Sequence, residues 1–222
     1  MRKQGRKSSP MPNAQCPMPN AQCPMTKRII GLTGGIATGK TTVTNYLAST
    51  YNLPILDADI YAREAVSLGS PVLDAIAKRY GQEILLADGN LHRQKLGEII
   101  FNREDERNWL ESLIHPYVRD RFVEAIIQCS SEILVLVVPL LFEAGMTDLV
   151  TEIWVVHCSQ EQQLQRLMQR NHLNQQQAQV RINSQLSLAE KVARANIVLD
   201  NSSSLEVLLK QVDMAVKAPS VN

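Results

Sequence analysis

The stretch Gly34-Gly35-Ile36-Ala37-Thr38-Gly39-Lys40-Thr41 (GGIATGKT) decides how this sequence folds. It fits the spacing G-x-x-x-x-G-K-[ST] without a gap. It follows an apolar strand predicted over residues 28–33 and opens a helix predicted from about residue 40 to residue 49. Glycine lets successive backbone N–H groups face the oxygens of a phosphate, and the start of a helix adds positive potential at the same point. The stretch therefore predicts a phosphate-binding loop of the kind that holds a nucleoside triphosphate.

Each residue of this loop has an expected role in holding the triphosphate, and ATP is the expected nucleotide. Lys40 would supply positive charge to the β and γ phosphates, the Thr41 hydroxyl would ligate Mg²⁺, and Thr42 would assist it. The predicted nucleotide-binding set in the loop is Gly34, Gly35, Ile36, Ala37, Thr38, Gly39, Lys40, Thr41 and Thr42. The alternative is an ordinary glycine-rich turn, which the full match between a strand and a helix disfavours.

Short apolar runs alternate with helical runs along the rest of the chain. Strands are predicted at residues 28–33, 54–57, 133–138, 153–157 and 196–199, with helices in most of the intervals. The long helical region before the third of these strands should break near residues 69–71 and 88–90. It should also be interrupted at His115-Pro116, because proline cannot continue a helix undisturbed. The alternation predicts an α/β fold, a doubly wound five-stranded parallel sheet with right-handed crossovers.

The sequence lacks the motifs that are typical of two large classes of phosphate-loop protein. Regulatory GTPases need a guanine-reading N-K-x-D after a late strand, and that position reads V-H-C-S at residues 156–159. Motor ATPases and transporters need an Asp at the end of a Walker B strand, and the strand at 133–138 is followed by P-L-L-F-E. A small-molecule kinase is therefore the expected class.

Charged side chains outside the loop are the candidates for catalysis. Asp57 and Asp59 follow the second strand, where ligands of open α/β sheets bind, and residues two apart in extended backbone face the same way. A kinase needs a carboxylate that orients the acceptor hydroxyl and takes its proton, although one of the pair could merely cap the next helix. Arg166 and Arg170 share a helix face and would cover the phosphates from a lid, unless that glutamine-rich helix is simply solvated. The predicted catalytic set is Asp59, Lys40 and Arg166.

Composition and charge narrow the remaining possibilities. The chain has 222 residues, 45% of them hydrophobic, and its formal net charge of +1 offers no large basic face for nucleic acid. Four scattered cysteines and the lack of a long apolar run favour a cytoplasmic protein over a secreted or membrane-bound one. Residues 1–24 contain a tandem MPNAQCP repeat and are predicted to be a disordered tail.

Taken together, the motifs of this sequence resemble those of the dephospho-coenzyme A kinases. The resemblance rests on L-T-G-G-I-x-x-G-K-[ST] at 32–41, D-A-D-x-x-A-R-E at 57–64, His115-Pro116, V-P-L-L-F-E at 138–143, Q-x-x-R-x-x-x-R at 163–170 and Asp200-Asn201. These motifs extend over residues 26 to about 217. The resemblance implies transfer of the γ-phosphate of ATP to the ribose 3′-hydroxyl of dephospho-coenzyme A, the last step of coenzyme A synthesis.

The resemblance also implies one kinase domain, residues 25–220, in three parts. These are a phosphate-loop core (25–57, 130–160 and 195–220), a helical region that binds the coenzyme (about 60–129) and a helical lid (about 161–194). By analogy Asp59 is the general base, and Asn201 lies near the adenine of ATP. The implied acceptor site or its support consists of Asp57, Asp59, Arg63, His115, Leu140, Leu141, Phe142 and Glu143. His115 could equally be a satisfied core histidine, and Asp200-Asn201 could be a turn.

The sequence departs from the family pattern at a few positions. Ala37 and Thr38 stand where glycine and serine are usual, and Asn171 stands where Asp is frequent. Alanine should fit at position 37 if its φ is negative. Two alternatives stay open: a kinase of the same architecture for a nucleoside, a sugar acid or shikimate, and a regulator that binds ATP without useful chemistry. The oligomeric state is also left open.

Overall fold

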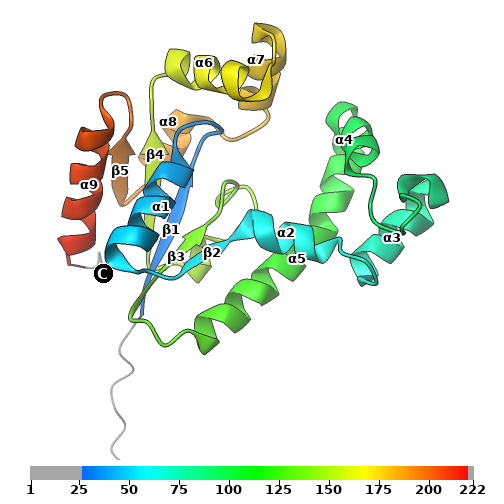
Figure 1. The fold of residues 1–222 in the computed structure, drawn as a ribbon, viewed down its shortest axis with the longest axis horizontal. Helices are drawn as coiled ribbons and strands as arrows, with labels where there is room; N and C mark the ends of the chain where they lie inside the picture. The colour runs from blue at the N-terminus through cyan, green and yellow to red at the C-terminus, as the bar shows by residue number, and fades with distance from the viewer. Residues whose placement is uncertain (1–26, 220–222) are drawn as a thin grey trace, which may run out of the picture.

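The computed structural model describes residues 27–219, which form an α/β core with helical extensions at one end of its sheet (Figure 1). The predicted tail, residues 1–24, lies outside the described residues. Five parallel strands form one sheet in the order β2-β3-β1-β4-β5, so the predicted fold class is confirmed. The strands are β1 (Arg28–Gly34), β2 (Ile55–Asp57), β3 (Ile133–Val137), β4 (Glu152–His157) and β5 (Ile197–Asp200).

Helices follow the strands in the order that the sequence predicts. They are α1 (Lys40–Tyr51), α2 (Ala58–Ala65), α3 (Pro71–Tyr80), α4 (Arg93–Asn102), α5 (Glu104–Gln128), α6 (Gln160–Asn171), α7 (Gln175–Asn183), α8 (Leu188–Ala193) and α9 (Leu205–Lys217). Short 3₁₀ turns lie at Gln82–Ile84 (η1) and Thr147–Leu149 (η2). The expected breaks near residues 69–71 and 88–90 separate α2 from α3 and α3 from α4.

Both faces of the sheet are covered, which explains why its central strands are apolar throughout. Alternate side chains of β1 and β3, such as Ile30 and Val135, pack with α1 and α9 on one face. The intervening side chains of β3, Leu134 and Leu136, pack against Phe122 of α5 on the other face. Ile30 and Val135 are partners in the β1–β3 register, so each layer of the core is continuous across the strands.

Helices α2 to α5 form an extension, here called the helical arm, to one side of the sheet (Figure 1). The arm has its own apolar cluster, built by Leu73, Ile76, Ile84, Leu96 and Leu110 among others. Such a cluster lets the arm keep its shape without packing against the sheet along its whole length.

The predicted interruption at His115-Pro116 was wrong, because α5 runs through Pro116 without a break. Leu110, before the proline, is buried in the arm, and Val118 and Phe122, after it, are buried against the sheet. Burial on both sides fixes the two halves of the helix, and it outweighs the single backbone hydrogen bond that proline removes.

The carboxyl ends of all five strands lie along the same side of the sheet, here called its carboxyl edge, since the strands are parallel. Helices α6 and α7 stand above this edge in Figure 1, and the arm lies beside it. The fold therefore brings Gly34, Asp57 and Asp200, each the last residue of its strand, to one end of the molecule. Among residues 27–219, no helix combines the length and apolarity needed to cross a membrane.

Candidate functional site

The loop between β1 and α1 has the unusual backbone that its glycines predict. Gly34 and Gly39 have φ angles of +146° and +106°, a region that side chains rarely adopt. A Cβ at Gly34 would lie 2.5 Å from the carbonyl oxygen of Val156, so the loop also needs this glycine for close approach to β4. The Thr38 hydroxyl donates to the Gly35 carbonyl at 2.9 Å and closes the turn just before α1 begins at Lys40.

The alanine at position 37, where glycine is usual in the family, strains this loop. Its φ is +60°, whereas the sequence led us to expect that the alanine would fit with a negative φ. The left-handed conformation costs a residue with a Cβ about 1 kcal/mol. Neighbouring contacts hold the strained residue: the Ile36 carbonyl accepts from Gln163 Nε2 at 2.9 Å, and the Thr38 side chain is fully buried.

Two amide side chains support the loop from outside. The Asn201 side chain donates through Nδ2 to the Thr38 carbonyl at 2.8 Å. The Asn201 backbone carbonyl accepts from Arg166 Nη2 at 3.1 Å. A Cβ at Gly39 would collide with the Asn201 amide, and one at Gly35 would collide with the Gln163 amide. Asn201 therefore braces the loop, while its expected contact with adenine stays a prediction.

Lys40 is folded back over the loop that precedes it. Its Nζ donates to the carbonyls of Gly34 and Gly35 at 3.0 and 2.8 Å. The pKa of Lys40 is lowered from 10.5 to about 8, chiefly by burial and also by the charges of Lys191 and Arg170, against the opposing effect of the carboxylates Asp59 and Asp57. A polyanion at this place would raise the pKa again, because it would compensate the buried positive charge.

The two aspartates after β2 have different local roles. Asp57 caps α2, since its Oδ1 accepts from the Asp59 backbone N–H at 2.8 Å. Burial raises the pKa of Asp57, with an opposing effect from that hydrogen bond. Asp59 lies in the first turn of α2 and lines a large cavity, so the prediction that Asp57 and Asp59 face the same way from extended backbone was wrong. The alternative of a capping aspartate applies to Asp57, and only Asp59 faces the cavity.

Arg166 and Arg170 of α6 both line the same cavity. Arg166 Nη1 is buried and has no hydrogen-bond partner among residues 27–219, so it is an unsatisfied donor. Burial raises the pKa of the nearby Cys158 thiol, and the positive charge of Arg166 opposes that shift. Arg170 is exposed and donates through Nε to Asn171 Oδ1 at 2.9 Å, so the asparagine that departs from the family pattern orients this arginine.

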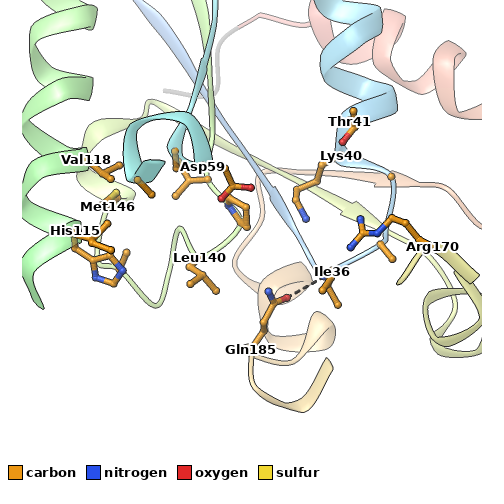
Figure 2. Close-up of a pocket in the computed structure, with 18 of the residues that line it drawn as sticks. Ile36, Lys40, Thr41, Asp59, His115, Val118, Leu140, Met146, Arg170 and Gln185 are labelled. Atoms are coloured by element: carbon orange, nitrogen blue, oxygen red, sulfur yellow. Dashed lines mark hydrogen bonds between the residues drawn. The ribbon is translucent and has the colours of Figure 1, made fainter. Parts of the chain in front are cut away.

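The cavity has a volume of about 920 Å³ and lies between the phosphate loop, the arm and α6 (Figure 2). Asp59 and Lys40 point toward one another across it, and Arg170 lies on the other side of Lys40 (Figure 2). The predicted site residues that line it are Ile36, Ala37, Gly39, Lys40, Thr41, Asp59, His115, Leu140, Arg166 and Arg170. Residues from five separate parts of the chain therefore meet in one space.

Other predicted site residues lie outside this cavity. Of the 140–143 segment, only Leu140 lines it: Leu141 is fully buried in the core, and Phe142 packs under the Arg194 guanidinium at 4.2 Å. Glu143 faces Lys191 instead. The remaining predicted residues that are not in its lining are Gly34, Gly35, Thr38, Thr42, Asp57, Arg63 and Asn201. Leu140 alone of residues 140–143 therefore lines this cavity, because Leu141 and Phe142 are used for packing and Glu143 pairs with Lys191.

Arg63 lies one cavity further along the arm. Together with Asp59 it lines a smaller space of about 370 Å³ next to Leu96 and Ile114. Ile114 lines the main cavity as well, so the two spaces adjoin. Arg63 is therefore placed to contact a ligand that extends from the main cavity toward α4.

Sequence reasoning missed Lys191 of α8. This side chain is fully buried, and its Nζ bonds to Glu143 Oε1 and to the Pro139 carbonyl, each at 2.9 Å. Burial alone would raise the pKa of Glu143, but hydrogen bonds from Lys191 and from backbone N–H groups, that of Leu186 included, lower it overall. A lone lysine on a predicted helix carries no motif that marks it as buried.

Sequence reasoning also missed Gln185, in the turn after α7. Its Oε1 accepts from the Ile36 backbone N–H at 3.0 Å, and its side chain lines the main cavity (Figure 2). Glutamine is frequent in this part of the chain, so no sequence signal distinguishes it from its neighbours.

The residues present fit a nucleoside triphosphate. A glycine-shaped loop at a helix start, a lysine with a lowered pKa and a buried, unpartnered arginine donor line one cavity. These groups would each be stabilised by phosphate oxygens, since all supply hydrogen-bond donors or positive charge. The Thr41 hydroxyl lies at the start of α1, where it could reach a Mg²⁺ ion held by such phosphates.

Comparison with known proteins identifies the family. A family model described as dephospho-CoA kinase matches residues 28–206. The chain belongs to the dephospho-CoA kinase family. It is 76% identical over 191 residues to the dephospho-CoA kinase of Trichormus variabilis (strain ATCC 29413 / PCC 7937), covering 86% of this chain and 97% of that relative. The dephospho-CoA kinase of Nostoc sp. (strain PCC 7120 / SAG 25.82 / UTEX 2576) is 74% identical over the same number of residues, with the same coverage.

Two solved structures also resemble this chain in fold. TT1252 from Thermus thermophilus is 31% identical with a TM-score of 0.73, covering 87% of this chain and 99% of that one. The dephospho-CoA kinase from Campylobacter jejuni is 27% identical with a TM-score of 0.65, covering 86% and 96%. The predicted family and the kinase class are thereby confirmed.

Proposed function

We propose that this chain transfers the γ-phosphoryl group of ATP to the ribose 3′-hydroxyl of dephospho-coenzyme A, which completes coenzyme A synthesis. The observation that carries the proposal is the one cavity that Lys40, Asp59 and Arg166 share. Membership of the dephospho-CoA kinase family supports the choice of acceptor.

In this proposal, the phosphate loop and α6 hold the triphosphate from two sides. Backbone N–H groups of residues 36–41 and the Lys40 ammonium bind phosphate oxygens, and Arg166 adds the Nη1 donor that has no partner among the described residues. Arg170, on the same face of α6, adds a second positive charge. Mg²⁺, when bound near the Thr41 hydroxyl, would neutralise phosphate charge and align the reacting groups.

Asp59 acts as the general base on the opposite wall. It accepts the proton of the acceptor hydroxyl as that oxygen forms a bond to the γ-phosphorus and the bond between that phosphorus and the β,γ-bridging oxygen breaks, leaving ADP. Lys40 and Arg166 stabilise the negative charge on the transferring group. Asp59 and Lys40 line the same cavity and point toward one another across it (Figure 2).

The arm would bind the rest of the acceptor. Its contribution to the main cavity is apolar around His115, with Ile114 and Val118 beside it, and Met146 and Leu140 complete this wall. An apolar wall that adjoins the smaller space near Arg63 suits a long acceptor with both apolar and charged parts. The division of the domain into core, coenzyme-binding region and lid belongs to this proposal.

The deciding experiment measures ADP release from Mg-ATP by the full chain, with and without dephospho-coenzyme A. We expect strong stimulation and coenzyme A formed in equal amount to the ADP. Stimulation by another hydroxyl compound but not by dephospho-coenzyme A would favour a kinase for a nucleoside, a sugar acid or shikimate. Binding of ATP with slow hydrolysis and no stimulation by any acceptor would favour a nucleotide-dependent regulator.

A cytoplasmic location also belongs to the proposal. Its support is chemical: Cys129 and Cys158 are both free thiols, which suits a reducing compartment. The absence of a nucleic-acid partner stays a prediction from composition, and the requirement for Mg²⁺ is tested by adding a chelator to the same assay.

A further inference from the structure

Gln185 bonds directly to the phosphate loop from a segment 149 positions later in the chain. Its Oε1 accepts the Ile36 backbone N–H at 3.0 Å, and the side chain lines the cavity that also holds Lys40 (Figure 2). Backbone N–H groups in such a loop are the donors that bind phosphate. A side-chain oxygen of this chain therefore occupies a donor that a phosphate oxygen could use.

Gln163 bonds to the carbonyl of Ile36, and a bound ligand need not disturb this bond. Its Nε2 donates to the Ile36 carbonyl at 2.9 Å, and the residue is 4% exposed and does not line the main cavity. A carbonyl oxygen cannot bind a phosphate oxygen, whereas an N–H group can. The Gln163 bond therefore fixes the loop, and the Gln185 bond is the one open to exchange.

The backbone next to Gln185 is anchored separately. The Leu186 N–H donates to Glu143 Oε1 at 2.9 Å, and Glu143 pairs with the buried Lys191 at the same distance. The Gln185 side chain can consequently leave Ile36 by rotating, while the segment that carries it stays attached to the core.

We propose that Gln185 is a positioning residue that occupies the Ile36 N–H in the nucleotide-free protein and yields it to a phosphate oxygen when the triphosphate binds. The proposal rests on the ATP binding proposed above. While the site is empty of nucleotide, the bond satisfies a loop donor and keeps the loop formed, and it competes with the ligand for that donor. Only a ligand that brings an acceptor oxygen to Ile36 can displace it, so the competition affects ATP and not adenosine.

Calorimetric titration of ATP and of adenosine tests the exchange. Gln185→Leu removes the competing oxygen at similar volume, and we expect ATP to bind about three- to tenfold more tightly, the worth of one neutral hydrogen bond. Adenosine affinity should not change. Gln179→Leu is the matched control, because Gln179 lies in α7 and donates to Asn183 at 2.8 Å, outside the cavity. A purely structural role for Gln185 would make the Leu variant bind ATP equally or more weakly, which would overturn the proposal.

Hydrogen exchange of the Ile36 amide, followed by NMR, gives a second readout in the absence of turnover. The amide should be protected in the wild-type protein, exchange faster in Gln185→Leu, and become protected again when ATP is added to the variant. Failure of ATP to restore protection would show that no phosphate oxygen takes this donor, and would overturn the exchange.

The shorter Gln185→Asn variant, whose side chain cannot span the same distance, repeats both measurements if the Leu variant does not fold. Wild-type protein that bound no ATP at all would contradict the proposed function. Wild-type protein that bound ATP with an affinity matched by both Gln185 variants would contradict only the role of Gln185.

Discussion

Replacing Lys40 by methionine is expected to stabilise the nucleotide-free protein while it removes ATP turnover. Lys40 is held among positive charges and is partly removed from water, so its pKa falls from 10.5 to about 8. A protonated lysine with such a pKa destabilises the folded state at pH 7 by about 3 kcal/mol. Methionine keeps an unbranched side chain of similar length and carries no charge, so the destabilisation by a buried charge disappears.

The net gain at pH 7 should be smaller than that figure. Methionine cannot make the two hydrogen bonds that Lys40 Nζ donates to the Gly34 and Gly35 carbonyls. Each of these is worth about 1 kcal/mol, which leaves a net stabilisation of about 1 kcal/mol. The phosphate site thus resembles other functional sites in which stability is lost for the sake of binding.

The pH dependence separates the charge effect from every other consequence of the substitution. The pKa of Lys40 is lower in the folded than in the unfolded chain, so the unfolded chain binds more protons between about pH 8 and pH 10.5. The destabilisation is therefore complete below pH 8 and disappears as the pH rises through this window. By pH 9.5 it should have fallen to about 1 kcal/mol, so the advantage of the variant over wild type should shrink by about 2 kcal/mol between pH 7 and pH 9.5.

Urea denaturation of both nucleotide-free proteins at pH 7 and pH 9.5 measures this change. Lys78→Met, at an exposed position of α3, is the control for loss of a lysine without loss of a buried charge. Added Mg-ATP should stabilise the wild-type protein and not the Lys40 variant, because only a protein that binds the ligand gains stability from it. A stability difference between wild type and Lys40→Met that is the same at both pH values would refute the argument from burial.

Three further substitutions test other parts of the site. Asp59→Asn should lower kcat by about 10²- to 10⁴-fold, because it removes proton acceptance. The ATP dissociation constant should stay near that of wild type, and a kcat within tenfold of wild type would exclude Asp59 as the base. Glu143→Gln should lower the free energy of unfolding by about 3 kcal/mol in urea denaturation, because it leaves the fully buried Lys191 without a carboxylate. The double variant Glu143→Leu with Lys191→Met should recover most of that loss in the same measurement. Ala37→Gly should raise the free energy of unfolding by up to about 1 kcal/mol, since it relieves a positive φ, whereas Ala37→Val should lower it, and equal stability of the two variants would contradict the assigned strain.

The fold was largely predictable because its strands and its loop carry local signals. The apolar run at residues 133–138 can only be a buried strand or a buried helix segment, and its β-branched residues and short length favour the strand. The path of α5 through Pro116 was not predictable in the same way. Whether a helix survives a proline depends on what Leu110 and Phe122 pack against, and both partners are distant in the sequence.

The candidate site was predictable where chemistry is tied to a motif and not where it depends on tertiary contacts. Lys40, Thr41 and Asp59 lie in recognisable segments, and all three line the cavity. The conformation of Asp59 could not be foreseen, because the cap by Asp57 begins α2 at Ala58, two residues earlier than an extended pair would allow.

The conformation of the phosphate loop depends on side chains that no loop motif contains. Ile36 is bonded by Gln163 and Gln185, and Thr38 by Asn201, across separations of 127, 149 and 163 positions. Each contact is an amide side chain on a backbone group, a pairing that any glutamine or asparagine could make and that residue type alone does not specify. The spacing of the glycines therefore predicts which ligand the loop can bind. Amide side chains from the segments that follow β4 and β5 determine which of its backbone groups are already hydrogen-bonded: the carbonyls of Ile36 and Thr38 and the N–H of Ile36.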